Sequence, residues 1–110
     1  MPTTYKVLGQ AAPASTAEAT LYTVPSATQT VVSTISVANL TATAAVASIN
    51  IGVAGAASSN ANTLLKTVSI AANSVAAFTI GVTIGATDVI RITSGTSNAL
   101  SFQAFGSEIS

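Results

Sequence analysis

The chain has 110 residues, which is enough for one ordinary domain with a single core. Only 5% of its residues are charged and its formal net charge is zero, whereas charged residues make up about 25% of an average soluble domain. The sequence contains no His and no Cys, which excludes the usual general bases at neutral pH, the usual zinc ligands and the Ser-His and Cys-His nucleophile pairs.

The larger side chains are mainly Val, Ile and Thr, whose branching at Cβ favours strands over helices. Segments of this composition are bounded by Gly, Ser, Asn or Pro, which are typical of turns. In chain order we predict short strands at residues 5–8, 19–24, 31–40, 45–53, 64–70, 75–84, 88–93 and 99–105. The stretch 55–62 has turn composition without periodicity and is predicted to be a loop.

Within these segments, large apolar side chains alternate with small or polar ones, which is the period of a strand that buries one face. The alternation is clearest at 31–40 and 75–84. It predicts that the following side chains face the core: Val31, Ile35, Val37, Ile49, Ile51, Val53, Val68, Ile70, Phe78, Ile80, Val82, Ile84, Ile90, Ile92, Leu100, Phe102 and Ala104.

About eight short strands separated by turns predict an all-β fold, a single antiparallel β-sandwich of the jelly-roll or Ig-like kind. We expect residues 1–110 to form one domain, with an N-terminal strand or arm at 1–12 and a C-terminal tail at 106–110. A short helix at 11–19 or 42–47 is the alternative for these two Ala-rich stretches, because Ala is the best helix former.

Few residues could support catalysis or metal binding. The acidic residues Glu18, Asp88 and Glu108 are far apart in the sequence, so neither a carboxylate pair nor a calcium loop is expected. Thr63 and Lys66 have the spacing of a hydroxyl-x-x-Lys pair, but three residues along a strand place two side chains on opposite faces. We therefore expect an exposed Lys on a strand, no enzyme activity, no cofactor and no metal.

Nucleic acid and membrane are not expected partners. Three basic residues cannot neutralise a run of phosphates, and few aromatic side chains are present for base stacking. The most apolar stretch, 42–57, is interrupted by polar residues and is shorter than the roughly 20 residues that span a bilayer. Near the N-terminus, Val7 and Leu8 fall short of the apolar segment of a signal peptide, so we expect no export signal.

The surface must be covered mainly by Ser, Thr and Ala, because so few charged residues are present. Such a surface loses little side-chain entropy when another protein covers it, and a net charge near zero gives little repulsion between copies. The composition favours a part of a larger assembly. A secreted domain with a Ser and Thr coat is the alternative.

Four blocks of the sequence stand out together: Thr4-Tyr5-Lys6-Val7-Leu8-Gly9-Gln10, Leu21-Tyr22-Thr23-Val24-Pro25, Val31-Val32-Ser33-Thr34 and Phe105-Gly106-Ser107-Glu108-Ile109. Their pattern resembles small virion structural proteins of tailed phages, cyanophages among them. The resemblance implies a β-sandwich present in many copies, either a capsid decoration (cement) protein or a tail or baseplate accessory. Such proteins often carry charged residues in the strand after the third block, whereas residues 45–53 carry none.

Resemblance and composition together lead us to expect a capsid decoration protein that binds the major capsid protein lattice and stabilises the shell. The expected partners are the major capsid protein and further copies of the chain, with trimers at symmetry axes as one form. The expected location is the capsid surface of the virion, after synthesis in the host cytoplasm. The alternative is a tail-fibre or baseplate accessory or receptor-binding module. We predict Tyr5, Lys6, Phe105, Glu108 and Ile109 as contact residues, because terminal segments can extend along a neighbour.

Overall fold

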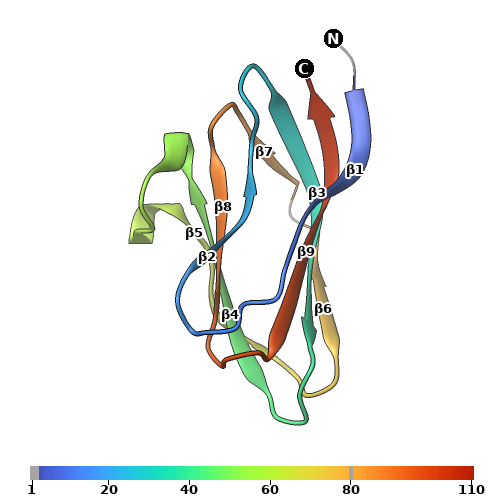
Figure 1. The fold of residues 1–110 in the computed structure, drawn as a ribbon, viewed down its shortest axis with the longest axis vertical. Coiled ribbons are helices and arrows are strands. Elements are labelled where there is room, and N and C mark those ends of the chain that lie inside the picture. The colour runs from blue at the N-terminus through green and yellow to red at the C-terminus, as the bar shows by residue number, and fades with distance from the viewer. Residues whose placement is uncertain (1–2, 80) are drawn as a thin grey trace.

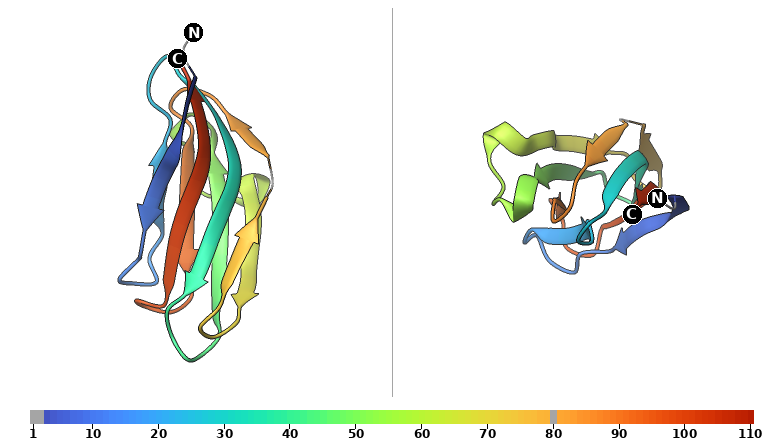
Figure 2. Two further views of the ribbon diagram at one scale, coloured as in Figure 1. Left: turned by 90° about the vertical axis from the view of Figure 1, so that its right-hand side faces the viewer. Right: turned by 90° about the horizontal axis from the view of Figure 1, so that it is seen from above.

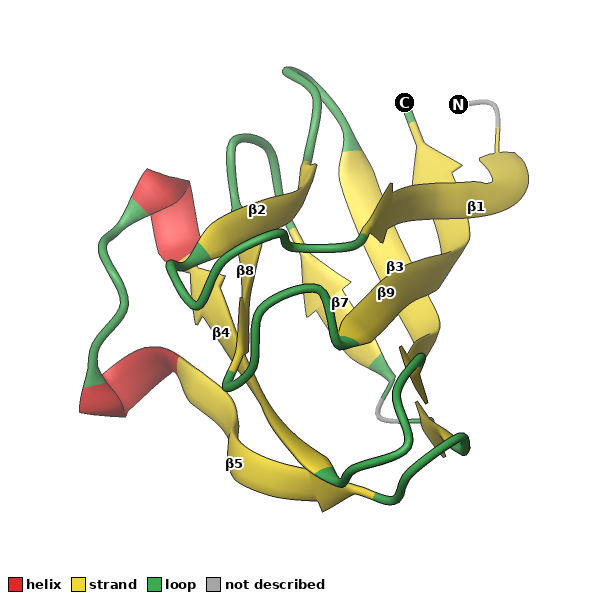
Figure 3. Cartoon of the chain, turned by 60° about the horizontal axis from the view of Figure 1, so that its bottom comes forward, coloured by secondary structure: helices red, strands yellow, loops and turns green. Residues whose placement is uncertain are grey.

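The computed structural model of the chain describes residues 3–79 and 81–110 (Figure 1). Within them the chain forms nine strands, β1 (Thr3–Ala11), β2 (Ala19–Thr23), β3 (Gln29–Asn39), β4 (Ala45–Gly52), β5 (Thr63–Ile70), β6 (Val75–Phe78), β7 (Val82–Ile84), β8 (Val89–Ser94) and β9 (Leu100–Ile109). Two single-turn 3₁₀ helices, Val53–Gly55 and Asn60–Asn62, lie in the connection between β4 and β5 and extend outward from the strands (Figure 3). No helix of the described residues is long and apolar enough to cross a membrane.

The strands form two sheets that lie against each other as two layers (Figure 2). The five-stranded sheet has the order β1-β9-β3-β6, and its fifth strand, β7, also pairs with β3. The four-stranded sheet has the order β2-β8-β4-β5. Every pair of neighbouring strands is antiparallel. The predicted all-β antiparallel β-sandwich is therefore confirmed.

The strand order identifies the kind of sandwich. Strands β6 and β7 pair with successive parts of β3 and act as one interrupted strand. With β6 and β7 counted as one strand, the chain has eight strands among the described residues. In this count the order is 1-8-3-6 in one sheet and 2-7-4-5 in the other. This is the order of an eight-stranded jelly roll. Of the two variants left open by the sequence, the connections match the jelly roll and not the Ig-like sandwich.

The core lies between the two sheets, and most of its predicted members are buried there. The confirmed residues are Ile35, Val37, Ile49, Ile70, Ile84, Ile90, Ile92, Leu100, Phe102 and Ala104. Ile51, Val68, Phe78 and Val82 are half-buried and pack against the core. Ile80 was also predicted to face the core and lies outside the described residues.

The prediction that Val53 faces the core is wrong. Its side chain is 66% exposed, because β4 ends at Gly52 and the chain turns there into the first 3₁₀ helix. A β-carbon at Gly52 would lie 2.4 Å from the carbonyl oxygen of Ala56, so the close return of the chain requires a glycine at this point.

The prediction for Val31 is also wrong, because β3 contains a β-bulge. Ser33 is an extra residue between Val32 and Thr34, which pair with consecutive residues of β9. An extra residue shifts the alternation by one, so Val32 is buried and Val31 lies on the outer face of the sheet.

The same bulge coincides with a break in the neighbouring strand. We predicted one strand at 75–84, whereas the structure has β6 and β7. Strand β6 pairs with residues 35–38 of β3 and β7 pairs with residues 30–32, so the break lies beside the bulge. Gly81 lies in this break with a φ of 67°, a left-handed conformation that cannot continue a strand.

Both ends of the chain belong to the five-stranded sheet. The prediction of a C-terminal tail at 106–110 is wrong, because β9 continues to Ile109 and pairs with β1 on one side and β3 on the other. The predicted N-terminal strand is present as β1 and is longer than residues 5–8. The two chain ends therefore lie side by side (Figure 1). The stretches 11–19 and 42–47 contain no helix.

Candidate functional site

Strand pairing brings the five predicted contact residues together at one end of the five-stranded sheet. Tyr5 and Lys6 lie in the edge strand β1, and Phe105, Glu108 and Ile109 lie in the adjacent strand β9. Residues separated by about 100 positions in the sequence are therefore neighbours, since the first and last strands are paired along their length.

These residues do not share one face of the sheet. Phe102 and Ala104 of β9 are buried between the sheets, so the alternation of a strand points Phe105 and Ile109 outward and Glu108 inward. Each residue of β1 points to the same side of the sheet as the residue of β9 with which it pairs.

The outward residues form an apolar patch. Val7 lies opposite Phe105 in the register, and Tyr5 lies two residues further along the same face. The Tyr5 side chain is 83% exposed and that of Val7 is 47% exposed. With Val31 of β3, which the bulge turns outward, these side chains form what we call the terminal patch: Tyr5, Val7, Val31, Phe105 and Ile109.

In the described part of the chain, the outer face of the five-stranded sheet carries no charged side chain. Besides the terminal patch, the register places on this face Thr3, Gln10, Gln29, Thr34, Ser36, Ala38, Val75, Ala77, Thr83, Ser101, Gln103 and Ser107. The charged residues lie elsewhere: Lys6 and Glu108 point inward, and Glu18, Lys66, Asp88 and Arg91 lie in or beside the four-stranded sheet. The sandwich thus has one outer face that is entirely neutral.

Lys6 and Glu108 belong to a cluster at the open end of the sandwich. The Lys6 ammonium lies 3.0 Å from one oxygen of the Glu108 carboxylate. The other oxygen accepts a hydrogen bond from the Tyr22 hydroxyl, which lies 2.8 Å from the hydroxyl of the buried Thr30. The cluster joins β1, β9 and β3 of one sheet to β2 of the other. Lys6 and Glu108 therefore have partners within the molecule.

The cluster changes the acidity of two of its members. The hydrogen bond from Tyr22, together with the Lys6 ammonium, lowers the pKa of the Glu108 carboxyl below its ordinary value of 4.5. Burial, reinforced by the hydrogen bond to Glu108, raises the pKa of Tyr22 to about 12. Glu108 is therefore ionised and Tyr22 protonated over the whole neutral range.

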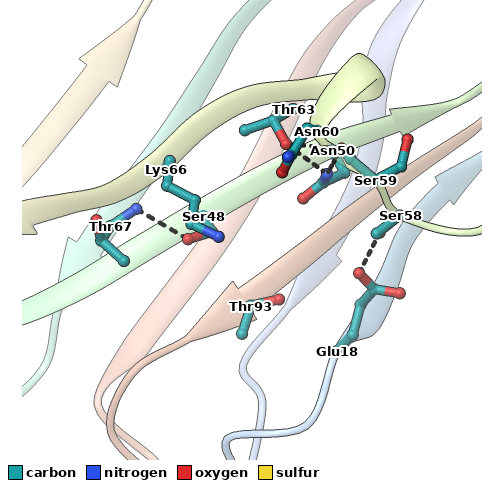
Figure 4. Close-up of a pocket in the computed structure, with 10 residues that line it drawn as sticks. All are labelled: Glu18, Ser48, Asn50, Ser58, Ser59, Asn60, Thr63, Lys66, Thr67 and Thr93. Atoms are coloured by element: carbon teal, nitrogen blue, oxygen red, sulfur yellow. Dashed lines mark hydrogen bonds between the residues drawn. The ribbon is translucent and has the colours of Figure 1, made fainter.

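A second candidate site, which the sequence did not reveal, lies on the four-stranded sheet. The loop between β4 and β5 closes over the outer face of this sheet and leaves a groove of about 430 Å³, which we call the polar groove (Figure 4). Its lining consists of Glu18, Ser48, Asn50, Ser58, Ser59, Asn60, Thr63, Lys66, Thr67 and Thr93. Polar residues at alternate positions of 45–53 followed by a polar loop were the signal available in the sequence.

Both Thr63 and Lys66 line this groove, so the prediction that they lie on opposite faces is wrong. The reason is that β5 carries irregularities in its pairing with β4. Thr63 and Leu65 are two residues apart but pair with Asn50 and Ile49, which are consecutive. The extra residue shifts the alternation. The prediction that Lys66 is exposed is confirmed.

The three side-chain carboxylates of the chain all have hydrogen-bond partners within the molecule. Glu18 accepts a hydrogen bond from Ser58, Glu108 from Tyr22, and Asp88 from the backbone N–H of Gly85 and of Ala54. Each carboxylate thus has its own separate partners. Among the described residues, no three acidic side chains are grouped so that they could hold a metal ion.

No protein-family model matches the chain, and a search of curated protein sequences finds no significant match.

Proposed function

We propose that this chain is a virion structural protein of a tailed phage, a capsid decoration protein that binds the major capsid protein lattice and stabilises the shell. The observation that supports this proposal is the neutral outer face of the five-stranded sheet with the terminal patch at one end. The phage identity comes from the sequence blocks described above.

Covering a neutral surface with another protein costs less free energy than covering a charged one. Burying an ionised side chain without a partner is expensive, whereas hydroxyl, methyl and amide groups lose less on leaving water. Side chains such as Ser, Thr and Ala also lose little rotamer entropy when they are immobilised. A large neutral face is therefore suited to contact with a protein lattice, and Tyr5 and Phe105 are the aromatic anchors that interfaces favour.

A chain that binds only the assembled shell stabilises it by mass action. The jelly roll is also found in viral capsid proteins, which agrees with the proposal as a fold-level analogy. Copies of the chain are proposed to follow the lattice symmetry, with trimers as one form.

The test uses particles of the encoding phage that lack this protein. Purified chain is added back, bound copies are counted after sedimentation, and genome release is followed on heating. We expect saturable binding of many copies and a higher release temperature. Unchanged release temperature in saturated particles would contradict the cementing role.

A matched pair of variants locates the contact. Phe105→Ser lies in the terminal patch, and Thr20→Ala is an exposed change in β2 of the four-stranded sheet. We expect Phe105→Ser to weaken particle binding by at least about tenfold, because an aromatic anchor is lost, and Thr20→Ala to bind as the wild type does. Equal binding of both variants would show that the terminal patch is not the attachment surface.

The alternative function is a tail-fibre or baseplate accessory. Copy number separates it from the decoration protein, because a capsid lattice carries hundreds of equivalent positions and a tail carries few. Labelling with an antibody against the chain, followed by imaging of whole particles, distinguishes the two locations directly.

A further inference from the structure

The lining of the polar groove disfavours two classes of ligand. No Val, Leu, Ile, Phe or Tyr side chain lines it, so it offers no large apolar side chain for an apolar ligand to contact. Its two charged groups, Glu18 and Lys66, are of opposite sign, so a multiply charged anion such as phosphate would meet a carboxylate as well as an ammonium. The lining suits a neutral ligand with many hydroxyl groups.

Several groups in the groove are available to such a ligand. The amide of Asn60, the ammonium of Lys66 and the hydroxyls of Thr67 and Thr93 make no hydrogen bond to another described residue. These groups include both donors and acceptors. They can therefore bond to the hydroxyl groups of a ligand without breaking a hydrogen bond to another described residue.

The wall formed by the loop is held in place by its own hydrogen bonds. The side-chain oxygen of Asn62 accepts from the backbone N–H of Ser59 and from the amide of Asn50, each at 2.9 Å. The amide nitrogen of Asn62 donates to the carbonyl of Ala57 at 3.0 Å. A wall fixed in this way does not have to be ordered when a ligand binds, which favours affinity.

The floor of the groove contains a strained residue. Thr67 has a φ of 47°, a left-handed conformation that is rare for a residue branched at Cβ. Its backbone N–H donates to the Ser48 hydroxyl at 2.9 Å (Figure 4). Strained positions and β-bulges are concentrated at functional sites, where they redirect side chains. Here the irregularity brings Lys66 into the groove beside the hydroxyl groups.

We propose that the polar groove binds a neutral saccharide unit, with Asn60, Lys66 and Thr93 as the contacts to its hydroxyl groups. The groove volume of about 430 Å³ lies within the range of small-molecule sites. No aromatic ring lines the groove to stack on the sugar, so we expect weak binding, with a Kd on the order of 1 mM. The site lies on the sheet opposite the terminal patch, so it can be occupied whether the chain is attached to a capsid or to a tail.

The test is an NMR titration of the isotope-labelled full chain with glucose, galactose, mannose and N-acetylglucosamine, each added separately up to about fifty times the expected Kd. For at least one sugar we expect saturable shifts confined to amides around Ser48, Thr67 and Thr93. Inorganic phosphate is titrated in parallel and is expected to cause no saturable shift there.

Matched variants test the contacts. Thr93→Val keeps the shape of the side chain and removes its hydroxyl, and we expect it to weaken sugar binding at least about fivefold. Thr83→Val makes the same change on the other sheet and is expected to leave binding unchanged. Far-UV circular dichroism checks that both variants are folded. The proposal is overturned if no sugar gives saturable shifts, if phosphate binds in the groove instead, or if Thr93→Val binds as well as Thr83→Val.

Discussion

Glu108 connects the two sheets and lies where the first and last strands of the chain pair. Its carboxylate receives the Lys6 ammonium of β1 and the Tyr22 hydroxyl of β2 while its own backbone pairs within the five-stranded sheet. The Lys6 side chain is 44% exposed, so the ion pair by itself contributes little. The hydrogen bond from the buried Tyr22 is the stronger contribution, because it joins a charged acceptor to a desolvated donor.

The Glu108→Gln variant tests this contribution. We expect a loss of about 1–2 kcal/mol in the free energy of unfolding at pH 7, measured by urea denaturation. The folded-state pKa of Glu108 is lowered, so the stabilisation is present above its ordinary pKa of 4.5 and is lost as the pH falls through the lower folded value. The difference between wild type and variant should therefore shrink as the pH falls below 4.5.

Glu18→Gln is the control for this experiment, because Glu18 is exposed and bonds to the exposed Ser58. We expect it to change stability by less than about 0.5 kcal/mol. A difference between wild type and Glu108→Gln that does not depend on pH would show that the carboxylate charge has no part in the stability.

Tyr22 gives an independent readout of the same cluster. In a Tyr5→Phe variant Tyr22 is the only tyrosine, and its ionisation can be followed by ultraviolet absorbance. Because its pKa is raised to about 12, we expect a midpoint near that value, with the Tyr22 contribution to stability present below pH 10 and declining as the pH rises toward 12. A midpoint near 10 in the folded protein would contradict a buried, hydrogen-bonded hydroxyl.

At the scale of the elements, irregular positions in the strands decide which residues face outward. The bulge in β3 turns Val31 to the outer face, and the one in β5 turns Lys66 into the polar groove. The bulge of β3 requires Gly106 at the facing position of β9, because a β-carbon there would lie 2.0 Å from the carbonyl oxygen of Val31.

Gly106→Ala is therefore expected to be strongly destabilising, since the obstructing atoms belong to the backbone and cannot rotate away. We expect a loss of about 3–4 kcal/mol or more in the free energy of unfolding. Gly85→Ala is the matched control, because the nearest atom to its new β-carbon, Oδ2 of Asp88, lies at 4.0 Å and its φ is not left-handed. If both variants are equally stable in thermal unfolding, the close approach of β3 and β9 is not present in solution.

At the scale of the whole molecule, the interior of the sandwich and its two outer faces differ in character. The interior supplies the stability, the outer face of the five-stranded sheet offers a neutral contact surface, and the outer face of the four-stranded sheet carries the polar groove and most of the charged residues. Phe102 and Phe105 show the division within one strand, since the first is fully buried and the second is in the terminal patch.

Alanine substitutions of these two residues should separate stability from binding. Phe102→Ala leaves a cavity between the sheets and is expected to cost about 3–5 kcal/mol in the free energy of unfolding. Phe105→Ala should cost less than about 1 kcal/mol. Calorimetry checks both values, and a loss for Phe105→Ala as large as that for Phe102→Ala would place both side chains in the core.

The sequence by itself determined the class of the fold and much of its core. Where apolar residues strictly alternate, the two-residue period of a strand is enough to predict which side chains face the core. Ile90 and Ile92, and likewise Leu100 and Phe102, are buried as predicted. The absence of His and Cys likewise excluded, from the sequence alone, the zinc ligands and nucleophile pairs that depend on these two residue types. Local patterns carry such information because they repeat every two residues along one strand.

Only the tertiary structure decided the irregular positions and the surfaces. The outward turn of Val31 depends on pairing with a strand about 70 residues away, and the polar groove depends on a loop closing over residues of β4, β5 and β8. The neutral face likewise exists because β1, β9 and β3 are neighbours in space. Hydrogen-bond register between distant strands sets all three features, and it leaves no periodic signal in the sequence of any single strand.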